Sequence, residues 1–498
     1  MRSRFVLPIL LLSSLLLTPL GHLAAQEKIA TGVTTSRPAA ADSVAKLKSS
    51  LDGLLQDKKL EGTRIGIHIV DVQSGQELYA HDADELYNPA SNAKLITSAA
   101  ALDVLGPQHT FTTRVFAEKV DGEKVPGAVY VTGDGEGFLL REDMLDWAAE
   151  IRARGITEIS GDIIVDDGPF KGGDFLPPGF DQKDEDASYR APVGAVSVNF
   201  NAVTVHVSPG KVGEPARITL DPPNDHVVID NQLTTVAGKA RRFNAASIST
   251  DEGKGTTIQV KGTVGADATA WSTRKRIDNP PLFAGSVFKA SLEALGVKVK
   301  GKVRRGAAPS GGVSLVTHAS EPLVYLLMAM NKWSNNFMAE QVFRDLGTTS
   351  AAGDARGTWD GGRKVLQDFL KKAAPPVQKS NILNGSGLYT GNRYSARQIS
   401  SVLRYMHHHT WGPEYKSTLA ISGVDGTLGR RLRGESTKGK IRAKTGTLNQ
   451  VSALAGYMIT ASGREVAFVI LFNDPPVRAW RLRPEQDAIA TAIAEWEG

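Results

Sequence analysis

Cysteine is absent from this chain of 498 residues. Its absence excludes thiol catalysis, a cysteine-ligated metal centre and attachment of a lipid to an N-terminal cysteine. It says little about stability, because a chain of this length can build a hydrophobic core without disulfides even when it is secreted.

A strong charge of one sign is also missing. The formal net charge is +5, and 41% of the residues are hydrophobic and 22% charged. This is the ordinary composition of a soluble protein, and the length leaves room for two or more domains. So mild a positive excess does not indicate a nucleic-acid partner; it suits loose attraction to an anionic cell envelope.

Hydrophobic runs long enough to matter occur near the N-terminus alone. Arg2 and Arg4 precede an apolar stretch over residues 5–20, and small residues close the segment near Ala25. We expect a cleaved signal peptide over residues 1–25. A membrane anchor is the alternative, but the stretch is short and polar residues follow it closely. We therefore expect an exported protein of the periplasm or cell envelope, with no transmembrane segment after signal removal.

The rest of the chain divides by its patterns. Residues 26–41 are rich in Thr, Ala, Ser and Pro and resemble a flexible leader. Residues 42–111 show helical and strand spacings in turn, whereas 112–312 consist mostly of short β-like runs separated by glycine and proline. Helical patterns return from about residue 321, and the chain closes with two long strands and a helix. An α/β body interrupted by a β-rich insertion is therefore expected.

Several serines are followed three residues later by a lysine, which on a helix puts both side chains on one face. If burial and a second cation keep such a lysine neutral, it can take the serine proton and generate a nucleophile. Five pairs share this spacing: Ser43/Lys46, Ser91/Lys94, Ser208/Lys211, Ser272/Lys275 and Ser286/Lys289.

The pair Ser91/Lys94 has the most favourable setting. It opens a helix of small, mostly apolar residues over 91–105, which can be buried centrally. Ser91 lies at the N-terminus of this helix, where the helix dipole favours an anion. A simple helix cap is the alternative role for Ser91.

Two further motifs could join this pair. Ser334 and Asn336 are two residues apart at the start of a helix predicted over 334–346, where a hydroxyl can relay a proton and an amide can hold a substrate. Lys444-Thr445-Gly446 occurs once, on a predicted strand. Its cation and hydroxyl can hold a carboxylate, and the glycine lets the backbone come close to a ligand.

In this order and setting, the three motifs resemble those of the penicillin-recognising serine acyl-transferases. More narrowly, the chain resembles the D-alanyl-D-alanine carboxypeptidase/endopeptidase family S13, the low-molecular-mass class C penicillin-binding proteins. The long interval between Ser91 and Ser334 supports this, together with four further segments: Gly161–Phe170, Tyr189–Pro192, Ser197–Asn201 and Asn384–Leu388. The resemblance covers residues 40–498.

The resemblance implies an α/β (α+β) fold class. We expect a penicillin-binding-protein transpeptidase-like domain, with an antiparallel sheet, helices on both of its faces and a helical subdomain. Residues 42–111 and 313–498 would form this domain. The β-rich insertion over 112–312 would form two small domains, one nested in the other.

The implied function is that of a serine D-Ala-D-Ala carboxypeptidase, a DD-endopeptidase or both, acting on peptidoglycan stem peptides and binding penicillin covalently. The sequence does not say which activity dominates, nor the oligomeric state. Ser91 would form the acyl-enzyme, with Lys94 as general base. Ser334 would pass a proton to the leaving amine, Asn336 would orient the substrate amide, and the charge of Lys444 would keep Lys94 neutral.

The remaining implied contacts bind the substrate. The backbone N–H groups of Ser91 and Thr447 would form the oxyanion hole, and Thr445 and Thr447 would receive a carboxylate. The implied set of substrate-binding residues is Thr445, Gly446, Thr447, Asn449 and Ser386. Stem peptides and β-lactams are the expected partners, without a cofactor, a metal or nucleic acid.

Some positions depart from common family members. These are Asn335, Tyr389, Thr390 and Asn449, and they could alter recognition of the third residue of the stem peptide. Asp166 and Phe170 could reach the site from the insertion or form a structural turn. A β-lactamase and a non-catalytic peptidoglycan-binding protein with a decayed site are the alternative functions; the insertion argues against the first and the complete motif set against the second.

Overall fold

The computed structural model describes residues 38–498, except for 172, 180–184, 250–254, 350–356 and 375–379. The expected signal peptide and the first part of the expected leader lie outside the described residues. Within the described part, no helix has the length and apolar character needed to cross a bilayer.

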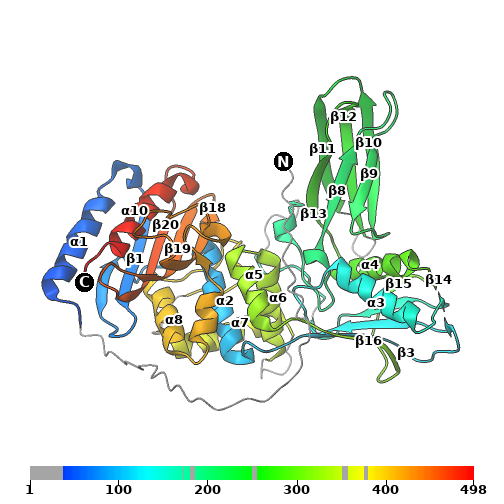
Figure 1. The fold of residues 1–498 in the computed structure, drawn as a ribbon, viewed down its shortest axis with the longest axis horizontal. Coiled ribbons are helices and arrows are strands. Elements are labelled where there is room, and N and C mark those ends of the chain that lie inside the picture. Colours follow the sequence, from blue (N-terminus) through cyan, green and yellow to red (C-terminus); the bar gives the residue numbers. More distant parts are fainter. Residues whose placement is uncertain (1–37, 172, 180–184, 250–254, 350–356, 375–379) are drawn as a thin grey trace, which may run out of the picture. The chain divides into compact units, whose positions relative to one another are not determined.

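A six-stranded antiparallel sheet forms the centre of the fold (Figure 1). Its strand order is β17-β18-β19-β20-β1-β2, so the two ends of the described chain meet where β20 pairs with β1 along its whole length. The central strands read as nearly continuous apolar runs because helices cover both faces. The strands are β1 (Arg64–Asp71), β2 (Glu77–His81), β17 (Ala420–Ile421), β18 (Ile441–Leu448), β19 (Val451–Ile459) and β20 (Glu465–Asn473).

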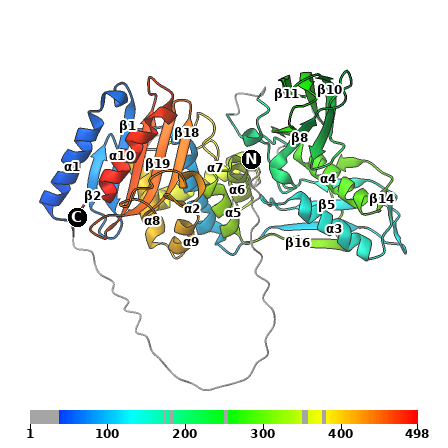
Figure 2. The same cartoon turned by 45° about the horizontal axis from the view of Figure 1, so that its top comes forward.

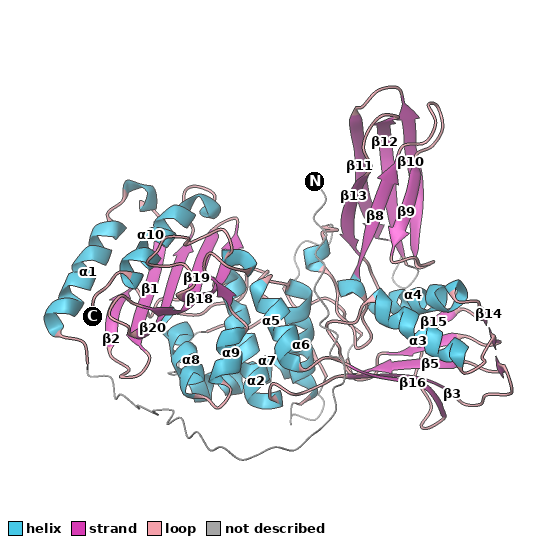
Figure 3. Cartoon of the chain, in the orientation of Figure 1, coloured by secondary structure: helices cyan, strands magenta, loops and turns pink. Residues whose placement is uncertain are grey.

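Helices from different parts of the chain cover the two faces of this sheet (Figure 3). On one face, α1 (Ala41–Leu55) and α10 (Arg483–Ala494) pack through residues such as Leu51 and Ile489. On the other, α8 (Ala396–His408) packs against β1, β19 and β20. The expected antiparallel sheet with helices on both faces is therefore present.

A group of helices lies beside α8. It contains α5 (Leu323–Lys332), α6 (Asn336–Thr348), α7 (Trp359–Ala373) and α9 (Gly412–Ser417), arranged around α2 (Ala93–Leu105). Every residue of α2 from Ala93 to Leu102 is buried. The central burial predicted from its small residues is confirmed, and small side chains permit it because neighbouring helices can approach closely on all sides.

The chain between α2 and α5 forms further sheets (Figure 2). A five-stranded sheet has the order β15-β7-β5-β3-β16, and helices α3 (Arg141–Ala153) and α4 (Pro280–Ala294) pack together beside it. Its strands are β3 (Thr112–Ala117), β5 (Val129–Gly133), β7 (Ile163–Asp166), β15 (Val303–Arg305) and β16 (Val313–Ala319). A small parallel sheet joins β4 (Lys124–Val125), β6 (Glu158–Ile159) and β14 (Lys298–Val299).

Two three-stranded sheets lie between β7 and α4 in the sequence. Their orders are β13-β8-β9 and β10-β12-β11. The strands are β8 (Ala202–Ser208), β9 (Arg217–Asp221), β10 (Val227–Val236), β11 (Arg241–Ser249), β12 (Thr256–Gly265) and β13 (Trp271–Arg276). The chain between α2 and α5 is the intervening region. Because β16 pairs with β3, residues 313–319 belong with this region, beyond the boundary expected at 312. The division into domains stays a prediction.

Gly66 on β1 gives the first testable prediction. A Cβ there would lie 2.4 Å from the ring of Tyr87, and Tyr87 is held by its hydroxyl, which donates to the carbonyl of Ile65 at 2.8 Å. We expect Gly66→Ala to lower the free energy of unfolding by about 1–3 kcal/mol, because the rigid ring must shift. The midpoint of urea denaturation measures this.

Gly53 provides the matched control. It lies on the exposed side of α1 with no atom near the position of its missing Cβ. Gly53→Ala should raise stability by roughly 0.5–1 kcal/mol through helix propensity. Equal effects of the two substitutions would contradict the packing of Tyr87 on Gly66.

Candidate active site

Ser91 is presented by a short, tightly fixed segment before α2. Ala90 has a φ of 44°, and residues Ala90–Asn92 form a 3-10 turn from which the helix continues. The Asn88 side chain accepts the N–H of Ala90 at 2.9 Å, and Asn473 at the end of β20 clamps the backbone of Asn88 at 2.8 and 3.1 Å. The sheet thereby fixes the place of the serine.

Lys94 lies one turn further on and is fully buried. Its Nζ donates to Ser91 Oγ at 3.1 Å, to Asn336 Oδ1 at 2.7 Å and to the carbonyl of Ser386 at 2.7 Å. A neutral amine has two N–H groups, and the two carbonyl-type oxygens can take both of them. Its lone pair would then face the hydroxyl of Ser91.

Burial lowers the pKa of Lys94 to about 7, while the carboxylate of Glu340 opposes the shift. Glu340 is fully buried on α6, and its two oxygens accept the N–H groups of Gly385 and Ser386 at 3.0 Å each. Burial also raises the pKa of Glu340. Sequence reasoning missed this residue, although it lies four positions after Asn336, on the same helix face.

Lys444 on β18 is the second buried amine. It donates to Ser334 Oγ at 2.8 Å and to the carbonyl of Thr445 at 2.7 Å. Burial lowers its pKa well below the usual value, and the nearby Lys94 lowers it further. Burial is the largest cause of the lowered pKa for both amines; the role of the Lys444 charge in keeping Lys94 neutral stays a prediction.

The motif of Ser334 and Asn336 differs from its predicted local structure. The helix expected from Ser334 begins at Asn336, with Asn335 capping it by accepting the N–H of Met338 at 3.0 Å. Ser334 lies outside the helix with a φ of 57°, which turns its hydroxyl toward Lys444. The Nδ2 of Asn336 donates to the carbonyl of Tyr189 at 3.1 Å, so the intervening region contacts the site directly.

Two glycines permit the close backbone contacts around Ser91. Gly387 has a φ of 72°, and a Cβ there would overlap the carbonyl oxygen of Ala90 at 1.8 Å. At Gly446, a Cβ would lie 3.0 Å from the carbonyl of Pro89. Gly446 therefore lies against the segment carrying Ser91, and the close approach to a ligand that the sequence predicts stays a prediction.

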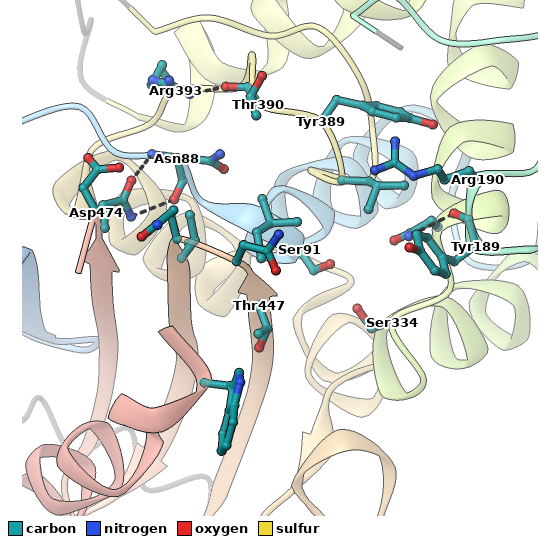
Figure 4. A pocket seen from close by; sticks show the side chains of 18 of the residues that line it. Asn88, Ser91, Tyr189, Arg190, Ser334, Tyr389, Thr390, Arg393, Thr447 and Asp474 are labelled. Carbon is teal, nitrogen blue, oxygen red and sulfur yellow. Dashed lines mark hydrogen bonds between the residues drawn. The ribbon is translucent and has the colours of Figure 1, made fainter. Parts of the chain in front are cut away.

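A pocket of about 740 Å³ opens beside Ser91 (Figure 4). Ser91 lies between Asn88 on one side and Tyr189 and Arg190 on the other. The wall includes Ser334, Asn336, Thr447, Asn449, Tyr389 and Thr390, with Glu185, Tyr189 and Arg190 from the intervening region. The sequence thus predicted residues that the fold brings together from α2, α6, β18 and the loop after it.

Ser386 lies elsewhere than its expected role suggests. Its side chain is fully buried, and its hydroxyl accepts the N–H of Leu388 at 3.1 Å. Ser386 therefore supports Lys94 through its carbonyl and does not face the pocket. Thr445 is partly buried, and its hydroxyl donates to Thr427 at 2.8 Å, whereas Thr447 is exposed to the pocket.

The other Ser-x-x-Lys pairs have structural partners. Ser286 donates to Asp225, which also pairs with Lys289 at 3.1 Å. Lys275 lies on strand β13 and pairs with Asp186 at 2.7 Å. Among these five pairs, and within the described part of the chain, a hydrogen bond between the serine and its lysine joins just Ser91 and Lys94. Tertiary contacts thus select one pair among five.

Asp166 and Phe170 fit the structural alternative. The carboxylate of Asp166 accepts the N–H groups of Gly168 at 2.7 Å and Ala308 at 2.9 Å. Phe170 is buried beneath the guanidinium of Arg344 at 5.0 Å. Both residues stabilise a turn of the intervening region.

The fold is that of the penicillin-binding-protein class, and comparisons with known proteins specify the family. Residues 47–496 match the D-Ala-D-Ala carboxypeptidase 3 (S13) family, to which this chain belongs. A D-alanyl-D-alanine carboxypeptidase of Actinomadura sp. (strain R39) is 35% identical over 93% of this chain and 87% of the relative. The D-alanyl-D-alanine carboxypeptidase DacB of Haemophilus influenzae is 27% identical over 84% of this chain and 87% of its own.

Solved structures agree with this assignment. Penicillin-binding protein 4 (dacB) from Haemophilus influenzae superposes with a TM-score of 0.75 at 25% identity, covering 88% of this chain and 98% of that one. Its complex with a β-lactam gives a TM-score of 0.71, with 89% and 98% covered. The family and the fold class predicted from the sequence are confirmed.

Glu340 gives the second prediction. We expect Glu340→Gln to destabilise the protein by about 1–3 kcal/mol, because an amide offers a single oxygen to the two N–H groups of Gly385 and Ser386. The urea midpoint measures this. Glu435→Gln, at an exposed loop position, is the control. An unchanged midpoint for Glu340→Gln would contradict the buried carboxylate contacts.

Proposed function

We propose that this protein is a serine-type D-Ala-D-Ala carboxypeptidase, DD-endopeptidase or both, acting on peptidoglycan stem peptides through an acyl-enzyme on Ser91. The observation that carries the proposal is the contact of Lys94 Nζ with Ser91 Oγ at 3.1 Å. Two carbonyl-type oxygens orient the same amine. A buried amine with a pKa of about 7 is suited to act as a general base near neutral pH.

In the first step, Ser91 Oγ attacks the carbonyl carbon of the penultimate D-Ala while its proton moves to Lys94. The backbone N–H groups of Ser91 and Thr447 stabilise the resulting oxyanion. Ser334, hydrogen-bonded to Lys444 at 2.8 Å, delivers a proton to the leaving amine as the C–N bond breaks. The proton that Lys94 took from Ser91 then replaces the one lost by Ser334, which leaves Lys94 neutral for the second step. The leaving amino acid departs and the acyl-enzyme ester remains.

In the second step, water attacks the ester carbonyl. Lys94 takes a proton from the water and returns a proton to Ser91 Oγ as the ester bond breaks, which releases the shortened peptide. Asn336 holds the substrate amide and Lys94 from one side, since its Oδ1 accepts from Lys94 and its Nδ2 faces the intervening region. Thr447 and Asn449 line the pocket, and Thr445 and Thr447 receive the substrate carboxylate.

A β-lactam presents the same reactive carbonyl. The similar protein of Haemophilus influenzae has been solved with a β-lactam bound. We infer that penicillin acylates Ser91 here and that the ester is hydrolysed slowly; rapid hydrolysis would instead favour a β-lactamase. Export to the periplasm or cell envelope, where peptidoglycan is found, follows from this function and from the expected signal peptide.

Replacement of Ser91 tests the function. Ser91→Ala should reduce D-alanine release from peptides ending in D-Ala-D-Ala by at least about 10³-fold, since the nucleophile is lost. Mass spectrometry of muropeptides digested by the purified protein measures this and also separates terminal trimming from cross-link cleavage. Ser43→Ala, in a Ser-x-x-Lys pair on α1, should keep full activity. Residual release by Ser91→Ala at the wild-type rate would refute the mechanism.

The pKa of Lys94 predicts a pH profile. Below about pH 7 the amine is protonated and cannot accept a proton, so the rate of penicillin acylation should rise through this pH and level off above it. In Glu340→Gln the inflection should move to lower pH, because the carboxylate of Glu340 raises the pKa of Lys94. Stopped-flow acylation between pH 5 and 9 is the measurement; a flat profile would argue against Lys94 as the base.

A further inference from the structure

Positive charge is concentrated on two segments beside β18. Residues 426–450 and 475–484 contain ten lysines and arginines and one acidic residue, Glu435. Because the whole chain has a formal net charge of +5, the rest of it is net negative. So uneven a distribution is typical of a surface that attracts an anionic partner.

The fold joins the two segments. Arg431 forms an ion pair with Asp487 on α10 at 2.5 Å and donates to Gln486 at 3.0 Å. The 3-10 turn η7 (Ala479–Leu482) packs against β18 and β19. Its first N–H donates at 3.1 Å to the carbonyl of Asn449, which lines the pocket. The loop before β18 and the segment before α10 therefore meet through α10 and β18.

Two cations of the loop lie side by side without an acidic partner. A Cβ at Gly423 would lie 2.9 Å from Cγ of Lys438 and 3.5 Å from Cγ of Arg433. Both side chains are exposed, and neither takes part in an ion pair within the described part of the chain, whereas the nearby Arg431 does. Like charges held next to each other repel, so this pair does not stabilise the loop. An anion from outside removes the repulsion.

Exposed apolar side chains border the cations. Trp480, which lines the pocket, is half exposed, and the guanidinium of Arg481 lies 5.7 Å from the centre of its ring. Val424, directly after Gly423, is exposed as well. Aromatic and apolar side chains among cations suit a ligand that carries both carboxylates and apolar faces, such as those of sugar rings.

The place of this surface favours a polymer as its ligand. Trp480 belongs both to the surface and to the wall of the pocket beside Ser91. A flat membrane resting on the surface would cover the edge of the pocket and hinder the entry of a stem peptide. A polymer that inserts one stem peptide into the pocket instead presents its neighbouring strands, with further carboxylates and sugar rings, to the surface beside it.

We propose that this surface docks polymeric peptidoglycan through the carboxylates of strands next to the stem peptide in the pocket. Its exposed cations are Arg430, Arg433, Lys438, Lys440, Arg478 and Arg481. The proposal rests on the proposed function and extends it from the stem peptide to the polymer. Docking holds the polymer near Ser91 and raises the effective concentration of stem peptides there. Because the cations are exposed, salt weakens the docking, and small soluble substrates gain nothing from it.

The test is the double variant Arg433→Glu/Lys438→Glu, whose two positions do not line the pocket. The control Lys239→Glu/Arg242→Glu makes the same change in net charge at exposed positions just before and on β11. Co-sedimentation with purified insoluble peptidoglycan, at low and at high NaCl, measures docking. Acylation by benzylpenicillin, followed by intact-protein mass spectrometry, reports on folding and on the active site. Sedimentation with vesicles of phosphatidylglycerol measures binding to an anionic membrane.

In Arg433→Glu/Lys438→Glu, the apparent Kd for insoluble peptidoglycan should rise about 10-fold or more at low salt, since each reversal turns an attraction into a repulsion. High salt should weaken binding of the wild type toward the level of this variant. Digestion of insoluble peptidoglycan should fall in parallel. Acylation by benzylpenicillin should change less than about 3-fold, because the reacting groups are distant and unaltered. The control variant should match the wild type in every assay.

Three results would overturn the proposal: an unchanged affinity of Arg433→Glu/Lys438→Glu for peptidoglycan, an equal loss in the control variant, or tighter binding of the wild type to the vesicles than to peptidoglycan. Absence of a benzylpenicillin adduct in the wild type would instead reject the proposed function. Because sedimentation requires no catalysis, the two failures are distinguishable.

Discussion

The burial of one amine, Lys94, is the constraint on which the rest of the site depends. A lysine inside a protein is stable when its protons are matched by acceptors, and here a serine hydroxyl, an amide oxygen and a backbone carbonyl surround it. Each acceptor comes from a different part of the chain, so the segment carrying Ser91, helix α6 and the loop over residues 385–387 must meet at one atom. The same burial gives Lys94 a pKa suited to proton transfer at neutral pH.

Helix α6 connects this centre with the intervening region. At its start Asn336 contacts Lys94 and the carbonyl of Tyr189, and one turn later Glu340 holds the loop behind Lys94. Next, Gln341 donates to the carbonyls of Gly135 and Gly194 at 3.0 and 2.9 Å. One helix therefore contacts both the intervening region and Lys94. Tyr189 and Arg190, which belong to the intervening region, also line the pocket.

How far the sequence predicted the site depends on the range of each contact. Ser91 and Lys94 are three residues apart, so helical spacing predicts that their side chains lie on one face, as it does for four other pairs. The helix expected from Ser334 was wrong at its start, because the hydrogen bond to Lys444 and the cap by Asn335 decide the backbone there. Ser386 was expected to bind substrate but supports Lys94. Strands such as β11 and β13 carry no clear alternation in the sequence and form through pairing with β12 and β8.

By itself the sequence determined the motif set, the absence of thiol chemistry and a buried small-residue helix, because each depends on residue identity and local spacing. The tertiary structure decided which of five Ser-x-x-Lys pairs is joined by a hydrogen bond, since the acceptors that orient the lysine lie hundreds of residues away. It also decided that both Lys94 and Lys444 are buried, which lowers the pKa of each amine. Charge and pKa depend on burial and on distances in space, and neither can be read from the order of residues. The hydrogen bond from Arg483 on α10 to Thr447 on β18 likewise exists because α10 packs against β19, the strand next to β18.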